Sequence, residues 1–171
     1  QQPTVFAPDE ARRILEAAQE ERLHASFVIA IYLGLRIGEL LALEWGDVDW
    51  DEKTITIRRQ FNDANGKLIR QDFPKTKSGY RTLDMPDAVV AALRKWRVEQ
   101  AKERLLVGEA WVEPNLIFTT QIGTPYLPNN WRKRDYRRVL ERAGVPYRKP
   151  HALRHTAITA MGAAGLPART A

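Results

Sequence analysis

The chain has 171 residues, enough for one domain with a sizeable core, and its hydrophobic fraction of 44% is too high for a disordered tail. No apolar run is long enough to span a membrane, the N-terminus lacks the pattern of a secretory signal, and the absence of cysteine excludes disulfides and thiolate metal sites. The formal net charge is +6, so these features favour a cytoplasmic protein with a polyanionic partner.

The first third of the chain predicts helices. A helix is expected to begin at Pro8, because apolar residues recur at helical spacing up to Ala18 and acidic residues stand in its first turn. A second apolar helix is expected over 26–33, where Gly34 interrupts it. A third, short helix is expected over 36–43.

The middle of the chain predicts strands. Residues 54–58 alternate strictly and are rich in β-branched side chains. A turn signal at 62–66 is expected to let 68–73 pair back on this strand, and a second turn at 77–79 leads to a third strand over 80–85. These three strands would form a small antiparallel sheet.

The remainder predicts a helix from Pro86 to about Leu105, a short strand over 116–119, a basic helix over 128–143 and a last helix from 151 to about 164, which Gly165 ends. The fold class predicted is therefore α+β. We expect one mostly helical domain with a small three-stranded antiparallel sheet.

The positive charge is concentrated between Trp131 and Arg154, where nine basic and two acidic residues give +7 and leave −1 for the rest of the chain. Such a stretch is typical of a nucleic-acid-binding surface. The alternative is a solvated basic helix face, and composition separates DNA neither from RNA nor from an acidic protein. The candidate polyanion-contacting residues are two in the middle of the chain and seven in this stretch: Lys77, Arg81, Arg132, Lys133, Arg134, Arg137, Arg138, Arg148 and Lys149.

His151 and Arg154 form the first group with candidate chemistry. They are three residues apart on one helix face, where an imidazole and a guanidinium suit phosphate oxygens, although many helices carry such a pair as an ordinary surface group. His155 gives a spacing seen in zinc sites, but the zincin pattern needs Glu where Ala152 stands, and no nearby side chain supplies a third ligand. We therefore expect no metal.

Arg36 and Glu39 form the second group. Arg36 is flanked by apolar residues, so we expect it to start its helix close to the core, and a buried guanidinium requires a partner. Glu39, one turn further on, is the expected partner. The pair is either purely structural, or it holds Arg36 rigid so that its free edge can meet a phosphate.

Lys75 lies in the predicted turn at 74–81. A lysine in such a turn is usually a solubilising side chain. Alternatively, its flexible ammonium can reach an anionic substrate and donate a proton to a leaving oxygen.

In this order, the three groups resemble the catalytic domain of the tyrosine recombinases, the phage integrase family. The resemblance rests on G-L-R-x-G-E-L-x-x-L-x-W-x-D at 34–47, K-T-K-S-G-x-R at 75–81 and H-x-L-R-H-T at 151–156. A type IB topoisomerase shares most of this chemistry. Two further classes of protein fit part of the pattern: a helix-turn-helix regulator that reads DNA with the basic helix, and a structural paralogue that does not cut DNA.

The resemblance implies a site-specific recombinase, or integrase, that cuts and rejoins double-stranded DNA through a phosphotyrosine intermediate, with no metal and no cofactor. It implies that Arg36 and Arg154 clamp the non-bridging phosphate oxygens and that Lys75 is the general acid for the leaving 5′-oxygen. His151 would hydrogen-bond the phosphate and assist proton transfer. Glu39 would orient Arg36, and His155 receives a packing role.

In this family another His or Trp, and then the nucleophilic Tyr, follow the His-x-x-Arg pair. All five tyrosines of this chain precede His151, and residues 166–170 resemble the approach to that further segment. We therefore expect a partial catalytic domain, 1–171, without the N-terminal core-binding domain and the C-terminal tyrosine segment, and inactive in cleavage by itself. The resemblance implies a homotetramer on DNA for a full-length, bacterial or phage-encoded protein, and we expect a monomer for this fragment.

Overall fold

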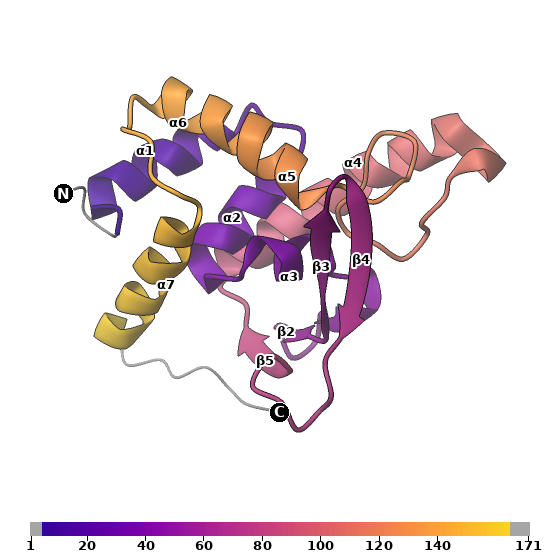
Figure 1. The fold of residues 1–171 in the computed structure, drawn as a ribbon, viewed down its shortest axis with the longest axis horizontal. Helices are drawn as coiled ribbons and strands as arrows, with labels where there is room; N and C mark the ends of the chain where they lie inside the picture. The colour runs from indigo at the N-terminus through magenta and orange to yellow at the C-terminus, as the bar shows by residue number, and fades with distance from the viewer. Residues whose placement is uncertain (1–4, 165–171) are drawn as a thin grey trace.

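The computed structural model describes residues 5–164, and the side chains of residues 5–157. Gly165 and residues 166–170, which carried two of the sequence-based expectations, lie outside the described residues. Helices and strands share one hydrophobic core, which confirms the single α+β domain. Figure 1 shows α1 (Pro8–Ala18) beside α6 (Arg137–Ala143), and the strands on the opposite side of the central helix α2 (His24–Leu33).

The central helix α2 is buried over most of its length and ends at Gly34, whose φ of 64° is left-handed. A Cβ at this glycine would lie 2.8 Å from the Cβ of Ala157 and 3.2 Å from the backbone oxygen of Arg154. The last helix, α7 (His151–Ala164), therefore packs directly on this turn. The short helix α3 (Ile37–Leu41) begins three residues after this glycine. The turn therefore sets how closely α7 approaches the start of α3.

The strands form two units, not one. The three-stranded antiparallel sheet has the order β1 (Val48–Asp49), β2 (Thr54–Ile57), β5 (Arg81–Asp84), and β3 (Arg59–Ala64) pairs with β4 (Lys67–Asp72) in a separate hairpin. The expected pairing of 68–73 with 54–58 is thus wrong.

The hairpin turn explains this difference. Asn65 and Gly66 both have positive φ, at 54° and 81°, which is the geometry of a two-residue hairpin turn. Such a turn makes Ala64 the partner of Lys67, so the register continues along 59–64 and does not reach β2. Residues 54–57 pair with 81–84.

Residues 116–119 are buried as expected but form no strand. Only single bridges join Glu44 to Leu116 and Thr119 to Pro125 within the described chain. The reason is that side chains of α4 (Asp87–Val107) take the carbonyls that a neighbouring strand would use. The Trp96 indole donates to the Ile117 oxygen at 2.6 Å, and the Gln100 amide donates to it at 2.9 Å.

The basic helix over 128–143 is present but contains a π-helical turn. It comprises α5 (Pro128–Asn130), the π segment η3 (Trp131–Tyr136) and α6, and a short turn η2 (Gly108–Ala110) precedes it in the chain. The wider turn places Trp131 and Tyr136, five residues apart, in the core, where their rings stack at 5.5 Å. The remaining element is the 3-10 turn η1 (Trp45–Asp47), which follows α3. Among the described residues, no helix is long and apolar enough to cross a bilayer.

Candidate functional site: a basic cavity between α3, η3 and α7

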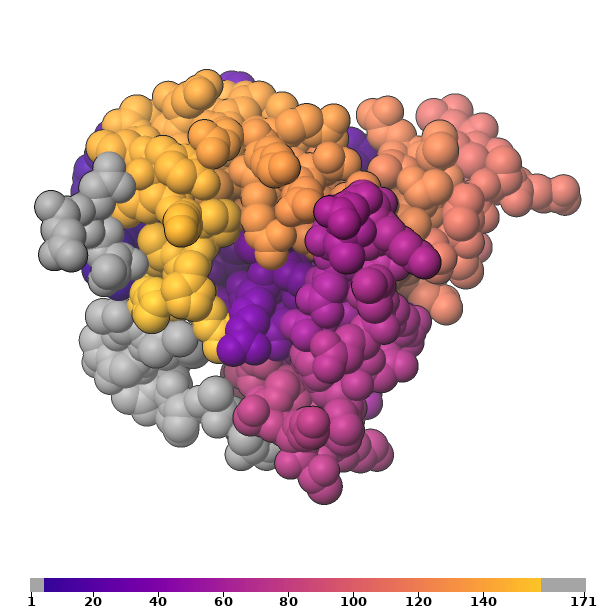
Figure 2. Space-filling view, viewed as in Figure 1, coloured from indigo at the N-terminus to yellow at the C-terminus, as the bar shows by residue number. Residues whose placement is uncertain are grey.

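A cavity of about 530 Å³ opens where the start of α3, the helix η3–α6 and the start of α7 meet. In Figure 2 this face turns to the viewer, with α3 between the yellow α7, the orange helix and the magenta strands. Its lining contains six cationic side chains, one imidazole and no carboxylate, which suits it to an anion. The polar lining residues are Arg36, Asn129, Arg132, Lys133, Arg137, Tyr147, Lys149, His151 and Arg154.

Arg154 reaches the cavity from α7 with 22% of its side chain exposed. Its Nη1 atom is buried and makes no hydrogen bond to any described residue. Burial, and then the charge of Arg36, lower the pKa of Arg154. A buried donor without an acceptor is costly, so an anion in the cavity would stabilise this arrangement.

Arg36 also lines the cavity, but it is exposed and does not pair with Glu39 through its side chain, which corrects the sequence-based expectation. The reason is that α3 begins at Ile37, so Arg36 is the N-cap residue with an extended backbone. The Glu39 carboxylate folds back to accept the backbone N–H of Arg36 at 3.0 Å. The Arg36 guanidinium therefore stays available to the cavity.

The Glu39 carboxylate is fully buried and binds another arginine instead. Arg81 donates Nη1 to Oε2 at 2.8 Å and Nη2 to Oε1 at 3.1 Å, a two-pronged contact. Arg154 approaches Oε1 with Nη1 at 3.6 Å. Glu39 thus lies beneath the cavity and supports Arg154 and the backbone of Arg36 simultaneously.

His151 stands at the mouth of the cavity, at the start of α7. Burial, and then the charges of His155, Arg154 and Arg36, lower its pKa. His155, expected to pack inside, is exposed, and its ring meets that of His151 edge-on at 4.4 Å. Among the described residues no group of three or more His, Asp or Glu side chains could hold a metal ion.

Lys75 does not line the cavity. It is exposed, like Lys77, on the loop 73–80 between β4 and β5. The structure therefore brings together Arg36, His151 and Arg154, and leaves the lysine on a neighbouring surface loop.

Apart from Lys77 on the exposed loop, the expected DNA-contacting residues separate into two groups. Arg132, Lys133, Arg137 and Lys149 line the cavity, and the Arg137 guanidinium lies 4.3 Å from the centre of the Tyr147 ring. Tyr147 is a lining residue that the sequence did not indicate, because no motif marks it.

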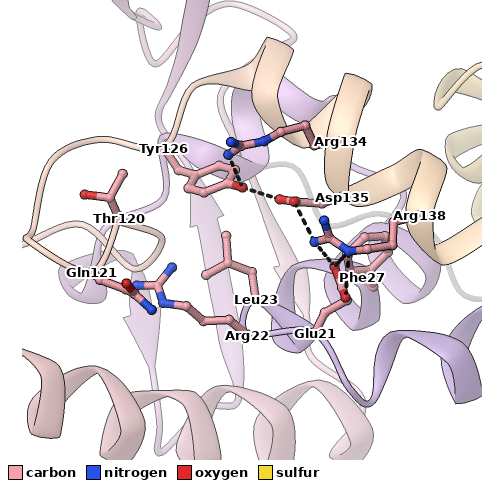
Figure 3. Close-up of a pocket in the computed structure, with 10 residues that line it drawn as sticks. All are labelled: Glu21, Arg22, Leu23, Phe27, Thr120, Gln121, Tyr126, Arg134, Asp135 and Arg138. Atoms are coloured by element: carbon pink, nitrogen blue, oxygen red, sulfur yellow. Dashed lines mark hydrogen bonds and ion pairs between the residues drawn. The ribbon is translucent and has the colours of Figure 1, made fainter.

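The other arginines are bound within the protein. Arg148 pairs with Glu10 at 2.9 Å and is 10% exposed, Arg138 pairs with Glu21 at 2.5 Å, and Arg81 pairs with Glu39. Arg134 contacts the Tyr126 hydroxyl in a second cavity of about 350 Å³ (Figure 3). In that cavity Tyr126 donates to Asp135, which also binds Arg138. Arg81 and Arg148 are thus nearly enclosed, whereas Arg134 and Arg138 have partners in the protein but remain exposed.

Known proteins resemble this chain over most of its length. The phage integrase family matches residues 4–171. The chain is 38% identical to a XerC-like tyrosine recombinase of Caldanaerobacter subterraneus subsp. tengcongensis (strain DSM 15242 / JCM 11007 / NBRC 100824 / MB4), over 96% of this chain and 45% of that protein. It is 31% identical to an integrase of Streptomyces ambofaciens, over 92% of this chain and 42% of that protein. The chain thus spans less than half the length of these relatives.

Among solved structures, the Tn1549 transposon integrase in complex with transposon right end DNA superposes with a TM-score of 0.80. The match covers 98% of this chain and 56% of that chain, at 23% identity. This likeness confirms the fold.

Proposed function

Since the chain belongs to the phage integrase family, we propose that it acts in site-specific recombination and that its basic cavity holds the DNA phosphate that is cut and rejoined. One observation carries the proposal: three of the four expected catalytic residues, Arg36, His151 and Arg154, line one cavity without a carboxylate. A phosphodiester would neutralise the repulsion between the two guanidiniums and provide the acceptor that Arg154 lacks.

In the proposed reaction, a tyrosine oxygen bonds to phosphorus and loses its proton, while the bond from phosphorus to the 5′-oxygen breaks and that oxygen takes up a proton. Arg36 and Arg154 bind the non-bridging oxygens, whose charge grows in the transition state. His151 hydrogen-bonds the same phosphate and assists proton transfer. Lys75 supplies the proton to the 5′-oxygen when bound DNA brings its loop to the cavity.

The nucleophile is assigned to none of the five tyrosines of this chain. Tyr126 and Tyr136 are buried, and the Tyr147 ring, which is 39% exposed, is engaged by the Arg137 guanidinium. Burial raises the pKa of Tyr136, which disfavours a phenolate there. We therefore propose that residues 1–171 bind and polarise the phosphate but form no covalent link by themselves.

The partner proposed is double-stranded DNA, with Arg132, Lys133, Arg137 and Lys149 at phosphates beside the cut site. A regulator that reads bases with the helix over 128–143 fits less well, because it gives no role to Arg36, His151 and Arg154 in one cavity. We further propose a tetramer on DNA for the full-length recombinase and a monomer for this chain alone. Light scattering tests the second point.

The test of function is covalent trapping. The natural protein is incubated with nicked DNA that carries its target site, and the 3′-phosphotyrosyl adduct is counted. Arg36→Ala and Arg154→Ala should each lower the trapping rate about 100-fold or more while the protein still binds duplex DNA. An adduct formed by residues 1–171 alone, or full-rate trapping by both variants, would contradict the proposal.

A further inference from the structure

The two ends of the loop that carries Lys75 are tied to each other. The backbone N–H of Phe73 donates to the backbone oxygen of Arg58 at 2.8 Å, and Arg58 Nη1 donates to the Tyr80 hydroxyl at 2.6 Å. The Phe73 ring packs on Gly79, where an added Cβ would lie 3.0 Å from a ring carbon. The loop 73–80 is therefore closed at its base, although its tip is exposed.

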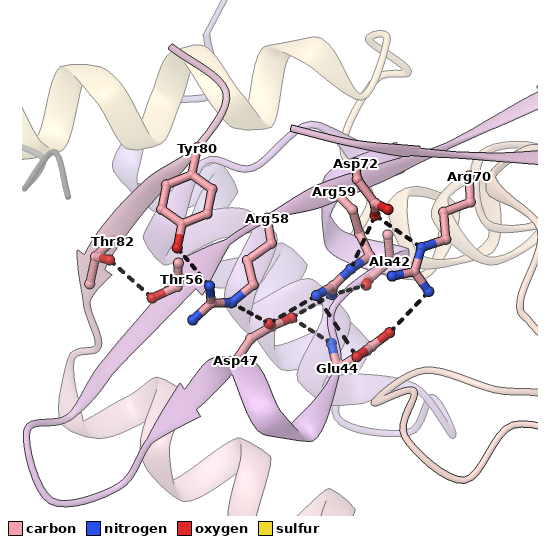
Figure 4. Close-up of polar contacts among 10 residues, drawn as sticks. All are labelled: Ala42, Glu44, Asp47, Thr56, Arg58, Arg59, Arg70, Asp72, Tyr80 and Thr82. Atoms are coloured by element: carbon pink, nitrogen blue, oxygen red, sulfur yellow. Dashed lines mark hydrogen bonds and ion pairs between the residues drawn. The ribbon is translucent and has the colours of Figure 1, made fainter. Parts of the chain in front are cut away.

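One side of this base is anchored to the end of η1. Arg58 Nε donates to the buried Asp47 carboxylate at 3.0 Å, and Asp47 also accepts from Arg59 at 2.7 Å (Figure 4). This network extends to Glu44, Arg70 and Asp72 and fixes the hairpin β3–β4 to α3 and η1. It holds the loop, but it makes no contact with the residues that line the basic cavity.

The other side of the base is anchored by Arg81, directly beneath the cavity. Arg81 Nη1 donates to the backbone oxygen of Gly79 at 2.9 Å, and the same atom donates to Glu39 Oε2 at 2.8 Å. Glu39 in turn accepts the N–H of Arg36. One guanidinium therefore links the base of the Lys75 loop to the carboxylate that supports the phosphate-binding arginines.

We propose that Arg81 is a positioning residue for phosphoryl transfer, which sets where the Lys75 loop stands relative to Arg36 and Arg154. This inference rests on the proposed function, because it needs Lys75 as the proton donor. Arg81 was expected to contact DNA, but only 15% of its side chain is exposed and its fork faces inward.

The charge of Arg81 has a second consequence for the site. It neutralises Glu39, so Arg154 is left at 3.6 Å with an uncommitted N–H. Without Arg81, Glu39 would draw Arg154 into a full ion pair and away from the phosphate. Arg81→Lys keeps the charge but cannot bridge Glu39 and Gly79 with a planar fork, so it isolates the positioning role from the charge.

The test compares two DNA substrates in the natural protein, with either oxygen or sulfur at the bridging 5′ position of the cut phosphate. A thiol has a pKa of about 8.5, so a thiolate leaves without a proton donor. An alkoxide needs one, because its conjugate acid is as weak as water, with a pKa of about 15.7. With sulfur at this position, cleavage no longer needs a proton from Lys75. It still needs Arg36 and Arg154 to bind the non-bridging oxygens.

We expect Arg81→Lys to cut the oxygen substrate about tenfold or more slowly and the sulfur substrate at close to the wild-type rate, as Lys75→Ala should. Arg154→Ala should slow both. The effects of Arg81→Lys and Lys75→Ala on the oxygen substrate should also be less than additive in the double variant, because both act through one proton transfer. Arg81→Gln also removes the charge, so it should slow both substrates, because Glu39 would then draw Arg154 away from the phosphate.

Arg22→Lys is the matched control. Arg22 also grips a carboxylate with two prongs, Glu103 at 2.7 Å, and donates to a backbone oxygen, that of Thr119 at 2.8 Å, away from the basic cavity. This variant should cut each of the two substrates at close to the wild-type rate. If Arg81→Lys slows both substrates equally or slows neither, the inference is wrong and the proposed function stands. If the wild-type protein cuts neither substrate, the proposed function fails.

Discussion

The Arg154 Nη1 atom lies 3.6 Å from the Glu39 carboxylate, yet it makes no hydrogen bond to the described residues. Arg81 already occupies both oxygens of that carboxylate. Glu39 therefore balances charge for two arginines while only one of them is fully bound. The other, Arg154, lines the basic cavity with a donor that makes no hydrogen bond to the described residues.

Removing the buried charge should test this balance. Glu39→Gln leaves Arg81 and Arg154 without a counter-charge, so we expect the free energy of unfolding to fall by about 3–5 kcal/mol. Urea denaturation gives the value. Added sulfate should restore more stability to this variant than to the wild type, because an anion can replace the lost charge. A loss below about 1 kcal/mol would show that Glu39 does not have this role.

Two arginines of the basic stretch should behave differently in DNA binding. Arg132→Ala removes a cavity cation, so the slope of log affinity against log salt should become less steep by about one. Arg148→Ala removes an internally paired cation, so it should leave that slope unchanged and lower stability instead. Fluorescence anisotropy with a DNA duplex at several salt concentrations separates the two. Equal slopes for both variants would contradict the division of the basic residues.

Binding should depend on pH through His151. Because its pKa is lowered in the folded protein, the folded state binds fewer protons than the unfolded state below about pH 6.5, and stability falls as pH falls through that region. A bound phosphate favours the imidazolium, so DNA binding should take up a proton and affinity should rise as pH falls from about 7 to about 5.5. Titration at constant ionic strength measures the slope. His151→Gln should flatten it, whereas His24→Gln should not, and a slope that survives in His151→Gln refutes the assignment.

The close approach of α3 to β3 should make Gly38 irreplaceable. An added Cβ would lie 2.4 Å from the backbone oxygen of Phe61, so Gly38→Ala should lower stability by about 1–3 kcal/mol. Gly46→Ala is the control, because nothing lies within 4 Å of its added Cβ. Thermal unfolding of both variants gives the comparison. Similar melting temperatures of the two variants would show that α3 and β3 can move apart at no cost in stability.

Local signals predicted most of the fold. Apolar spacing located α1, an apolar run located α2, Pro86 marked the start of α4, and the Asn65-Gly66 turn marked the hairpin. The sheet pairing could not be predicted, because it depends on where the turn fixes the register. The strand expected at 116–119 failed because side chains from α4 took its carbonyls, a contact that sequence order does not reveal.

The site was predicted in part for a similar reason. Motif order placed Arg36, His151 and Arg154 together, and the cavity contains all three. The partner of Glu39 was wrong, because proximity along the chain favoured Arg36 over Arg81, which is 42 residues away. The charge count likewise treated Arg138 and Arg148 as free, since their partners, Glu21 and Glu10, lie more than 100 residues earlier.

The π segment at 131–136 also fixes the angular phase of the helix that follows it. If these six residues wound as a regular α-helix, each would turn further around the axis, and every later side chain would rotate by about 100°. Arg137 would then turn away from the cavity, and Tyr136 would leave its stack against Trp131. The winding of this segment therefore decides which side chains of the later helix face the cavity.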